Sequence, residues 1–255
     1  MAGVRIRIVR LMMAQTRMKS LENLLVRWLP VPTGLAFVVS LYAVFFWVPT
    51  ERVQGVVQRI FYYHVPAAWS CFLAFGVACG ASIAYLSSRK RQWDHAAHAA
   101  VEVGMMFGTM VLVTGPIWAK PIWGAWWTWD SRLTTTLILW LIFASYLLLR
   151  EFTRGSETAA RFAAVLAIVG TLDIPLIVLS TRLWRTIHPA VLRTRGGESG
   201  LTDGAMLTTL LLCTAAFTLL FFWLWVLRMR TLRLADEVEV LQAEADRLEA
   251  LPSGG

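Results

Sequence analysis

Charged residues are scarce in this chain of 255 residues. Asp, Glu, Lys and Arg make up only 16% of it, whereas 57% of the residues are hydrophobic. A soluble globular domain is about one-quarter charged, and its surface helices need polar faces toward water. The composition therefore excludes an ordinary soluble protein and indicates a chain that lies mostly in lipid.

Cysteine is also rare, and its positions exclude two kinds of site. The sequence contains three cysteines and no CxxC pair. Neither a thiol–disulfide exchanger nor a cysteine-based zinc site is therefore expected. All three cysteines fall within apolar runs, where we expect them to serve as packing residues: Cys71, Cys79 and Cys213.

Long apolar runs, by contrast, recur along the chain. Each approaches the roughly 17–25 residues that a transmembrane helix needs, and the runs have almost no polar face. We therefore predict an all-α polytopic membrane protein with one six-helix membrane domain over residues 31–227. The predicted spans are Val31–Val48, Ala67–Ser87, Ala97–Ile117, Leu133–Leu149, Phe162–Thr181 and Gly204–Leu227.

The distribution of basic residues predicts the orientation of the spans. Of the 24 Lys and Arg residues, sixteen lie in the N-terminal segment, the second and fourth connections and the tail. Because cytoplasmic segments are rich in Lys and Arg, both termini are predicted in the cytoplasm. Residues 1–30 then form a basic cytoplasmic segment, residues 228–255 a cytoplasmic tail, and residues 50–66, 118–132 and 182–203 the outer loops. The net charge of +8 follows from this topology and requires no nucleic acid partner.

Two histidines are predicted on the outer side, each followed closely by proline. The first outer loop has helical periodicity, which predicts a short amphipathic helix in the membrane interface. His64 ends its apolar stripe just before Pro66, which we expect to open the next span. His188 stands directly before Pro189 in the third outer loop. Proline restricts the backbone at both places. The apolar stripe consists of Val53, Val56, Val57, Ile60 and Phe61.

Tryptophans crowd into the second outer loop, in the segment WGAWWTWDSRLT, residues 123–134. An aromatic belt at the membrane interface is the alternative interpretation. A belt, however, distributes over many helix ends and needs no following Asp-x-Arg, so the cluster favours a large, flat, apolar ligand. If the segment is helical, several of these residues share one face. The cluster comprises Trp118, Trp123, Trp126, Trp127 and Trp129.

A haem would suit this combination of residues. Imidazole binds iron well, and His64 and His188 would occupy its two axial positions. The tryptophans would form a wall for the macrocycle. Planar guanidinium groups would pair with its two propionates. The candidate guanidinium groups are those of Arg132, Arg182 and Arg185.

Three acidic side chains lie in or beside the predicted spans and cannot pair with a propionate. Asp130 would orient a tryptophan N–H, cap the fourth span or pair with its neighbouring arginine. Glu102 and Asp173 lie within predicted spans, where a carboxylate facing lipid costs roughly 2.5–3.5 kcal/mol, so both should face the bundle interior. We expect Glu102 to pair with Arg89 or Arg91.

Two cytoplasmic features complete the predictions. His95 and His98, at the start of the third span, are interpreted as interfacial polar residues. The tail has a short heptad seam with charged flanks. The seam either docks on a cytoplasmic ATPase subunit or lies on the membrane surface. Its residues are Leu234, Val238, Leu241, Ala245 and Leu248.

The segment WGAWWTWDSRLT resembles the WWD signature of haem-handling membrane proteins. With YYHVPAAW, WRTIHP and six spans, the chain is similar to the haem exporter protein C family of the cytochrome c maturation system over about Leu29–Leu227. The basic extension before about Met18 and the tail are predicted to depart from the family pattern. The resemblance assigns His64 and His188 as axial ligands and residues 123–132 as the surface for haem and its acceptor.

The resemblance also implies a cofactor, partners and a location. It implies a protein, not itself an enzyme, that holds haem b (iron protoporphyrin IX) at the periplasmic face of the bacterial inner membrane. The haem would pass to a membrane-anchored haem chaperone. The implied complex contains the membrane and ATPase subunits of an ABC-type transporter and a small single-span subunit, with ATPase activity in the partners.

Two other functions remain as alternatives. The first is a membrane-bound bis-histidine haem protein that transfers electrons. Such proteins usually hold haem between histidines in mid-membrane, and none of the six predicted spans has a histidine there. The second is a transporter with a tryptophan-lined opening, whose spans should be broken or polar at mid-depth; residues 170–175 alone suggest this.

Overall fold

The computed structural model of the chain describes residues 22–153, 156–184, 188, 201 and 203–249. Every regular element within these residues is a helix, and six helical stretches are long and apolar enough to cross a membrane. This confirms the predicted all-α polytopic fold. The six stretches are Glu22–Trp47, Val56–Ser88, Arg91–Trp123, Ser131–Phe152, Glu157–Ser180 and Gly204–Arg247.

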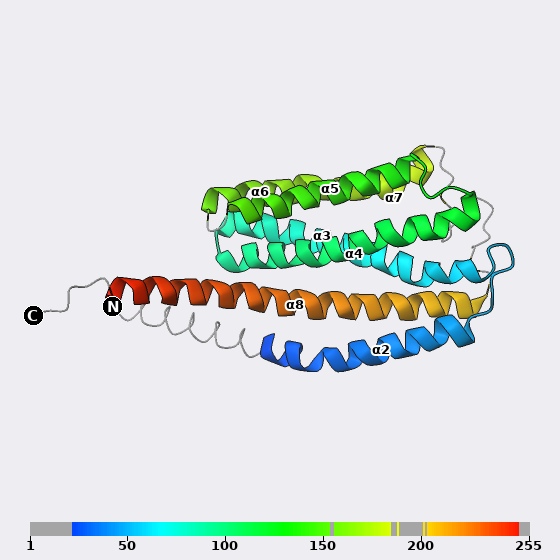
Figure 1. Ribbon diagram of the computed structural model, residues 1–255, viewed down its shortest axis with the longest axis horizontal. Helices are drawn as coiled ribbons and strands as arrows, with labels where there is room; N and C mark the ends of the chain where they lie inside the picture. The colour runs from blue at the N-terminus through cyan, green and yellow to red at the C-terminus, as the bar shows by residue number, and fades with distance from the viewer. Residues whose placement is uncertain (1–21, 154–155, 185–187, 189–200, 202, 250–255) are drawn as a thin grey trace, which may run out of the picture.

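The helices lie side by side along one direction and form three layers (Figure 1). An α3–α4 hairpin is the middle layer, between the helices α5, α6 and α7 on one side and the pair α2 and α8 on the other. The helices are α2 (Pro30–Tyr42), α3 (Phe61–Ser88), α4 (Arg91–Trp123), α5 (Ser131–Phe152), α6 (Glu157–Thr171), α7 (Asp173–Leu183) and α8 (Gly204–Glu249). Two short elements extend α2 and precede α3: the π-helical turn η1 (Ala43–Trp47) and the 3₁₀ helix η2 (Val56–Ile60).

The middle layer is packed closely through small residues and aromatic rings. Phe75 of α3 stacks on Phe143 of α5, with ring centroids 3.7 Å apart and nearly parallel planes. Gly104 of α4 lies against the same ring, since a Cβ built on it would be 2.7 Å from Phe75 Cε1. Small residues at helix contacts let backbones approach, and van der Waals packing then holds membrane helices together.

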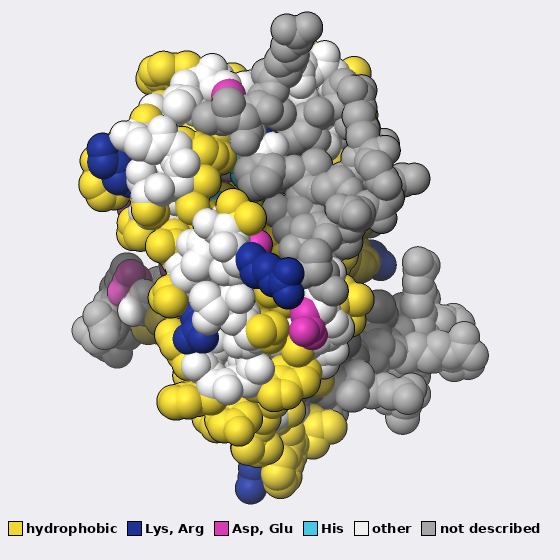
Figure 2. Space-filling view, turned by 90° about the vertical axis from the view of Figure 1, so that its right-hand side faces the viewer, with side chains coloured by type: hydrophobic (Ala, Val, Ile, Leu, Met, Phe, Trp, Pro, Cys, Tyr) yellow, Lys and Arg dark blue, Asp and Glu magenta, His cyan; other side chains and the backbone are white. Residues whose placement is uncertain are grey.

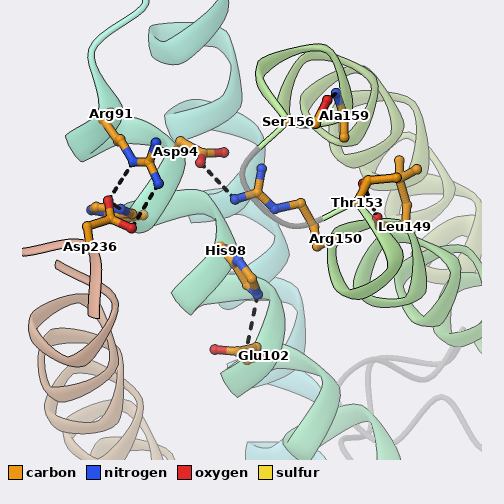
Figure 3. A network of polar contacts seen from close by, with 11 residues as sticks. Arg91, Asp94, His98, Glu102, Leu149, Arg150, Thr153, Ser156, Ala159 and Asp236 are labelled. Atoms are coloured by element: carbon orange, nitrogen blue, oxygen red, sulfur yellow. Dashed lines mark hydrogen bonds and ion pairs between the residues drawn. The ribbon is translucent and has the colours of Figure 1, made fainter. Parts of the chain in front are cut away.

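At the end where α8 projects beyond the bundle, ion pairs join α8 to α4 and α4 to α5 (Figure 3). Asp236 of α8 accepts from Arg91 and contacts His95 Nε2 at 2.7 Å. Asp94 accepts from Arg150 of α5 at 2.8 Å. His95 is therefore part of a network between helices, beyond the interfacial role predicted for it.

Glu102 has a different partner from the one predicted. It accepts two hydrogen bonds from Arg228 of α8 and lies 3.5 Å from His98 Nε2. The prediction of Arg89 or Arg91 was wrong because Arg91 lies three turns earlier, roughly 16 Å along α4, whereas α8 brings Arg228 level with Glu102. The carboxylate is nevertheless paired inside the bundle, as its cost in lipid requires.

The first outer loop also differs from its prediction. Residues 51–55 form a turn closed by a bridge between Glu51 and Gly55, and Gly55 has φ 63°. The 3₁₀ helix η2 then leads directly into α3, in place of a separate amphipathic helix over the apolar stripe. His64 and Pro66 consequently lie inside α3, and Pro66 does not open the span.

The structure bears on the predicted fifth span and on only part of the predicted loops and termini. The fifth span is divided at Leu172 into α6 and α7, within the region suspected of a break. Residues 1–21, 189–200 and 250–255, together with Arg185, lie outside the described residues.

We predict that alanine at Gly104 destabilises the bundle, because its Cβ would collide with the stacked Phe75 ring. Overpacking of this kind costs about 1–3 kcal/mol. The matched control is Gly76→Ala in α3, where a Cβ meets nothing within 4 Å and helix propensity favours alanine by up to about 1 kcal/mol. Thermal unfolding of the purified proteins in detergent should give a lower midpoint for G104A than for G76A. Equal midpoints would contradict the close contact.

Candidate functional site

A large cavity lies at the end of the bundle where α3 and α5 begin. It contains about 1150 Å³ free of protein atoms, part of it open to the surroundings. Ligand clefts are mostly apolar with a few polar groups, and this cavity has the same character. Its wall is mostly apolar and comes from α3, α4, α5 and α7, with side chains such as Trp69, Phe72, Val111, Leu139 and Trp140. Figure 2 faces this end, and the part not drawn in grey shows many hydrophobic side chains with a few charged ones among them.

The two predicted ligand histidines both line this cavity. His64 is on α3 and His188 belongs to the third outer loop, so the fold brings the first and third outer regions together. His188 also lines a smaller neighbouring cavity of about 390 Å³, and its ring meets Trp123 edge-on at a centroid distance of 6.1 Å. Two segments far apart in the sequence thus supply imidazoles to one space.

His64 is held in place by side chains of α4. It is 9% exposed, and its Nδ1 lies 2.8 Å from Thr114 Oγ1. The ring of Trp118, one turn further along α4, meets the imidazole edge-on at 5.7 Å. Trp118 is itself fixed, because its indole N–H donates to Gln54 Oε1 at 3.0 Å. The imidazole therefore has a defined position.

The tryptophan segment is not the helix considered from the sequence. Helix α4 ends at Trp123, where Gly124 adopts φ 74° and its N–H donates to Lys120 O. The chain then runs irregularly until α5 begins at Ser131. Trp123 and Asp130 therefore do not share one helical face, because the left-handed glycine ends the helix between them.

The tryptophans of this segment separate into inner and outer residues. Trp127 lines the large cavity, while Trp118 and Trp123 line the smaller one. Trp126 and Trp129 are 58% and 76% exposed. Of the five tryptophans of the cluster, Trp127 thus lines the large cavity, two line the smaller cavity, and two are exposed.

The charged residues of the segment have separate positions. Asp130 caps α5, since its Oδ1 accepts from the backbone N–H of Leu133 at 2.9 Å; this agrees with one of its three predicted roles. Arg132 lies in the cavity wall, where its cation can meet an anionic ligand group. Arg182 is in α7, but its side chain lies outside the described part, as does the whole of Arg185.

The residues of the cavity fit a haem. Two imidazoles suit an iron whose other ligands come from a porphyrin, and the apolar wall suits the macrocycle. Arg132 supplies a cation for a propionate. Trp127 Nε1 is buried without a hydrogen-bond partner among the described residues, so it is a donor available to a polar group in the cavity.

Thr114 and the deeper wall of the cavity were not predicted from the sequence. Thr114 is one of two threonines in an apolar run, and its contact with His64 depends on how α3 and α4 pair. Trp69 and Trp140 were visible as tryptophans within apolar runs, a signal that could have placed them in the wall.

Comparison with known proteins places the chain among haem exporters. The family profile described as Heme exporter protein C matches residues 8–244. Heme exporter protein C of Bradyrhizobium diazoefficiens is 37% identical over 228 residues, which are 89% of this chain and 86% of the relative. Heme exporter protein C of Escherichia coli K12 is 34% identical over 211 residues, 82% of this chain and 84% of the relative. A ccmC-like mitochondrial protein of cytochrome c biosynthesis from Marchantia polymorpha is 34% identical over 156 residues, 61% of this chain and 64% of the relative.

The match also corrects one prediction. The family profile begins at residue 8 and extends to residue 244. Residues 8–17 and most of the tail therefore lie within the family pattern, whereas both had been predicted to depart from it.

The cap on α5 gives a prediction for Asp130. Asparagine keeps an oxygen that accepts from Leu133 N–H, whereas alanine leaves that N–H without its cap, at a cost of about 0.5–2 kcal/mol. We expect Asp130→Asn to unfold near the wild-type temperature in detergent and Asp130→Ala to unfold at a lower one. If both variants lose the same stability, the negative charge rather than the cap is what matters at this position.

Proposed function

Because the chain belongs to the Heme exporter protein C family, we propose that it binds haem in the large cavity and passes it on for cytochrome c maturation. The observation that carries the proposal is that His64 and His188 line one apolar cavity although they come from distant segments. The protein acts by binding and transfer and is not itself an enzyme. When bound, the haem iron supplies axial coordination and redox chemistry.

The proposed ligand is haem b, iron protoporphyrin IX. His64 and His188 are the proposed axial ligands. The apolar wall, with Trp127, would remove the macrocycle from water, which contributes roughly 25 cal/mol for each Å² buried. Arg132 is the proposed partner of a propionate, with Arg182 and Arg185 as further candidates for the second. The haem would thus be held both by bonds from the histidines to its iron and by ion pairs from arginine to its propionates. Neither kind of bond alone would determine binding.

The proposed acceptor is a membrane-anchored haem chaperone at the periplasmic face of the bacterial inner membrane. Exposed Trp126 and Trp129 support a docking surface beside the cavity, because tryptophan is enriched among residues that dominate protein interfaces. The predicted topology supports the periplasmic side of the membrane, since this end of the bundle carries eight of the 24 Lys and Arg residues and the other end sixteen.

The proposed complex includes the membrane and ATPase subunits of an ABC-type transporter and a small single-span subunit, with ATPase activity in the partners. Helix α8 supports a cytoplasmic contact, because it continues to Glu249, beyond the bundle. Its seam residues Leu234, Val238 and Leu241 are exposed. Docking on the ATPase subunit and lying on the membrane surface both remain proposals for this seam.

Replacing the histidines tests the ligand assignment. Either His64→Ala or His188→Ala removes one axial bond but leaves the apolar burial, so each variant should keep part of its haem with an altered absorption spectrum. Added imidazole should restore the wild-type spectrum. The double variant should purify with at most weakly held haem. The control is His98→Ala, at the other end of the bundle, which should keep a wild-type spectrum.

A double histidine variant with a normal bis-imidazole spectrum would show that the assignment is wrong. Redox cycling of the bound haem with a quinol would favour the alternative of electron transfer.

The separation of the tryptophans gives a second test. Trp127→Ala removes part of the cavity wall and should lower the haem content of the purified protein. Trp126→Ala should leave haem content unchanged and weaken recovery of the chaperone, because truncating a hot-spot residue of an interface costs about 2 kcal/mol or more, roughly 30-fold in affinity. Haem content is measured by absorption and chaperone recovery by co-purification. Equal loss of haem in the two variants would contradict the separation.

A further inference from the structure

The hydroxyl of Thr114 makes two short contacts that together determine a proton position on His64. Thr114 Oγ1 lies 2.7 Å from the backbone oxygen of Met110 and 2.8 Å from His64 Nδ1. A hydroxyl has one hydrogen to donate and two lone pairs to accept with, whereas a carbonyl oxygen can only accept. The hydrogen of Thr114 therefore points to Met110 O, and Thr114 must accept from His64 Nδ1–H.

This arrangement selects one form of the imidazole. With the hydrogen on Nδ1, the Nε2 of a neutral imidazole carries the lone pair. The ring also lines the cavity, and with Nδ1 occupied by Thr114, Nε2 is the nitrogen left to meet a metal there. Metal-binding histidines almost always donate their other N–H to a fixed acceptor, which orients the ring and makes the binding nitrogen more basic.

We propose that Thr114 is a positioning residue that holds His64 as its Nδ1–H form, with Nε2 available to the haem iron. The inference rests on the proposed function, because it assumes that His64 binds iron. It adds a residue outside the tryptophan segment and the two histidines, on a different helix from His64.

The residues that follow Thr114 on α4 also hold the imidazole in place. Gly115 follows it, and a Cβ built there would lie 3.5 Å from His64 Cε1, so the backbone of α4 passes directly beside the ring. Trp118 meets the ring from the next turn of α4. Thr114 and Trp118 thus contact the imidazole from one helix, and Gly115 between them leaves room for it. A ligand group already held in its binding position loses less freedom on binding, which favours affinity.

Replacement of the hydroxyl tests this role. Thr114→Val keeps the size of the side chain but removes the hydroxyl that accepts from His64 Nδ1–H. Thr114→Ala removes the same hydroxyl and adds no bulk. Thr114→Ser retains a hydroxyl at this position. The matched control is Thr214→Val on α8, whose hydroxyl likewise donates to the carbonyl four residues earlier, Leu210 O. The measurements are the reduction potential, the electron paramagnetic resonance spectrum and the haem dissociation constant of the purified haem-loaded protein.

We expect Thr114→Val and Thr114→Ala to raise the reduction potential, because a less basic imidazole stabilises ferric iron less well. Their haem affinity should fall by roughly 10–100-fold, the usual effect of losing such a partner. Thr114→Ser and Thr214→Val should resemble the wild type in all three measurements. A purely structural role for Thr114 would lower stability without shifting the potential.

The inference is overturned if Thr114→Val or Thr114→Ala keeps the wild-type potential, spectrum and affinity. That outcome is distinguishable from failure of the proposed function. If His64→Ala retains a normal bis-imidazole spectrum, His64 is not a ligand and the functional assignment itself is wrong. If His64→Ala changes the spectrum while the Thr114 variants remain silent, only the role of Thr114 is rejected.

Discussion

Close contact between α3 and α4 is the constraint on which both the bundle and the site depend. Glycines of α4 meet α3 in a constant antiparallel register: Gly104 faces Phe75, Gly108 faces Cys71, and Gly115 faces His64. Moving a given number of residues forward along α4 corresponds to moving the same number of residues backward along α3. The three glycines lie on one side of α4, since they are separated by four and seven residues. The contact that packs the centre of the bundle therefore also sets the distance of His64 from α4.

The two ends of the bundle are stabilised by different forces, and α8 contacts both. At one end Arg228 and Asp236 of α8 pair with Glu102 and Arg91 of α4. Each of these charges has a partner of opposite sign on the neighbouring helix. At the other end Cys213 of α8 packs in the cluster that contains Trp118, the residue beside His64. Helix α8 thereby fixes the hairpin at its charged end and supports the site at its aromatic end.

The sequence predicted the six spans well because a long apolar run has few alternatives in lipid, but it placed several boundaries wrongly. Pro66 was taken as the start of a span, whereas the 3₁₀ helix lets the helix begin five residues earlier, at Phe61. The signals that end α4 and begin α5, Gly124 and Asp130, were present in the sequence and fit known caps. The partner of Glu102 could not be predicted, because it depends on the register between two helices far apart in the sequence.

For the site, the sequence identified which residues take part better than it identified which way their side chains face. It placed His64, His188, Trp127 and Arg132 at one site, and all four line one cavity. It could not separate Trp127 from Trp129, because the irregular backbone after Gly124 has no period from which to infer a facing side. For the proposed function this separation matters. A haem bound between a rigid helical hairpin and an irregular loop is held firmly on one side, and exposed tryptophans beside that loop leave a place for an acceptor. Such a site suits release as well as binding, which a carrier requires.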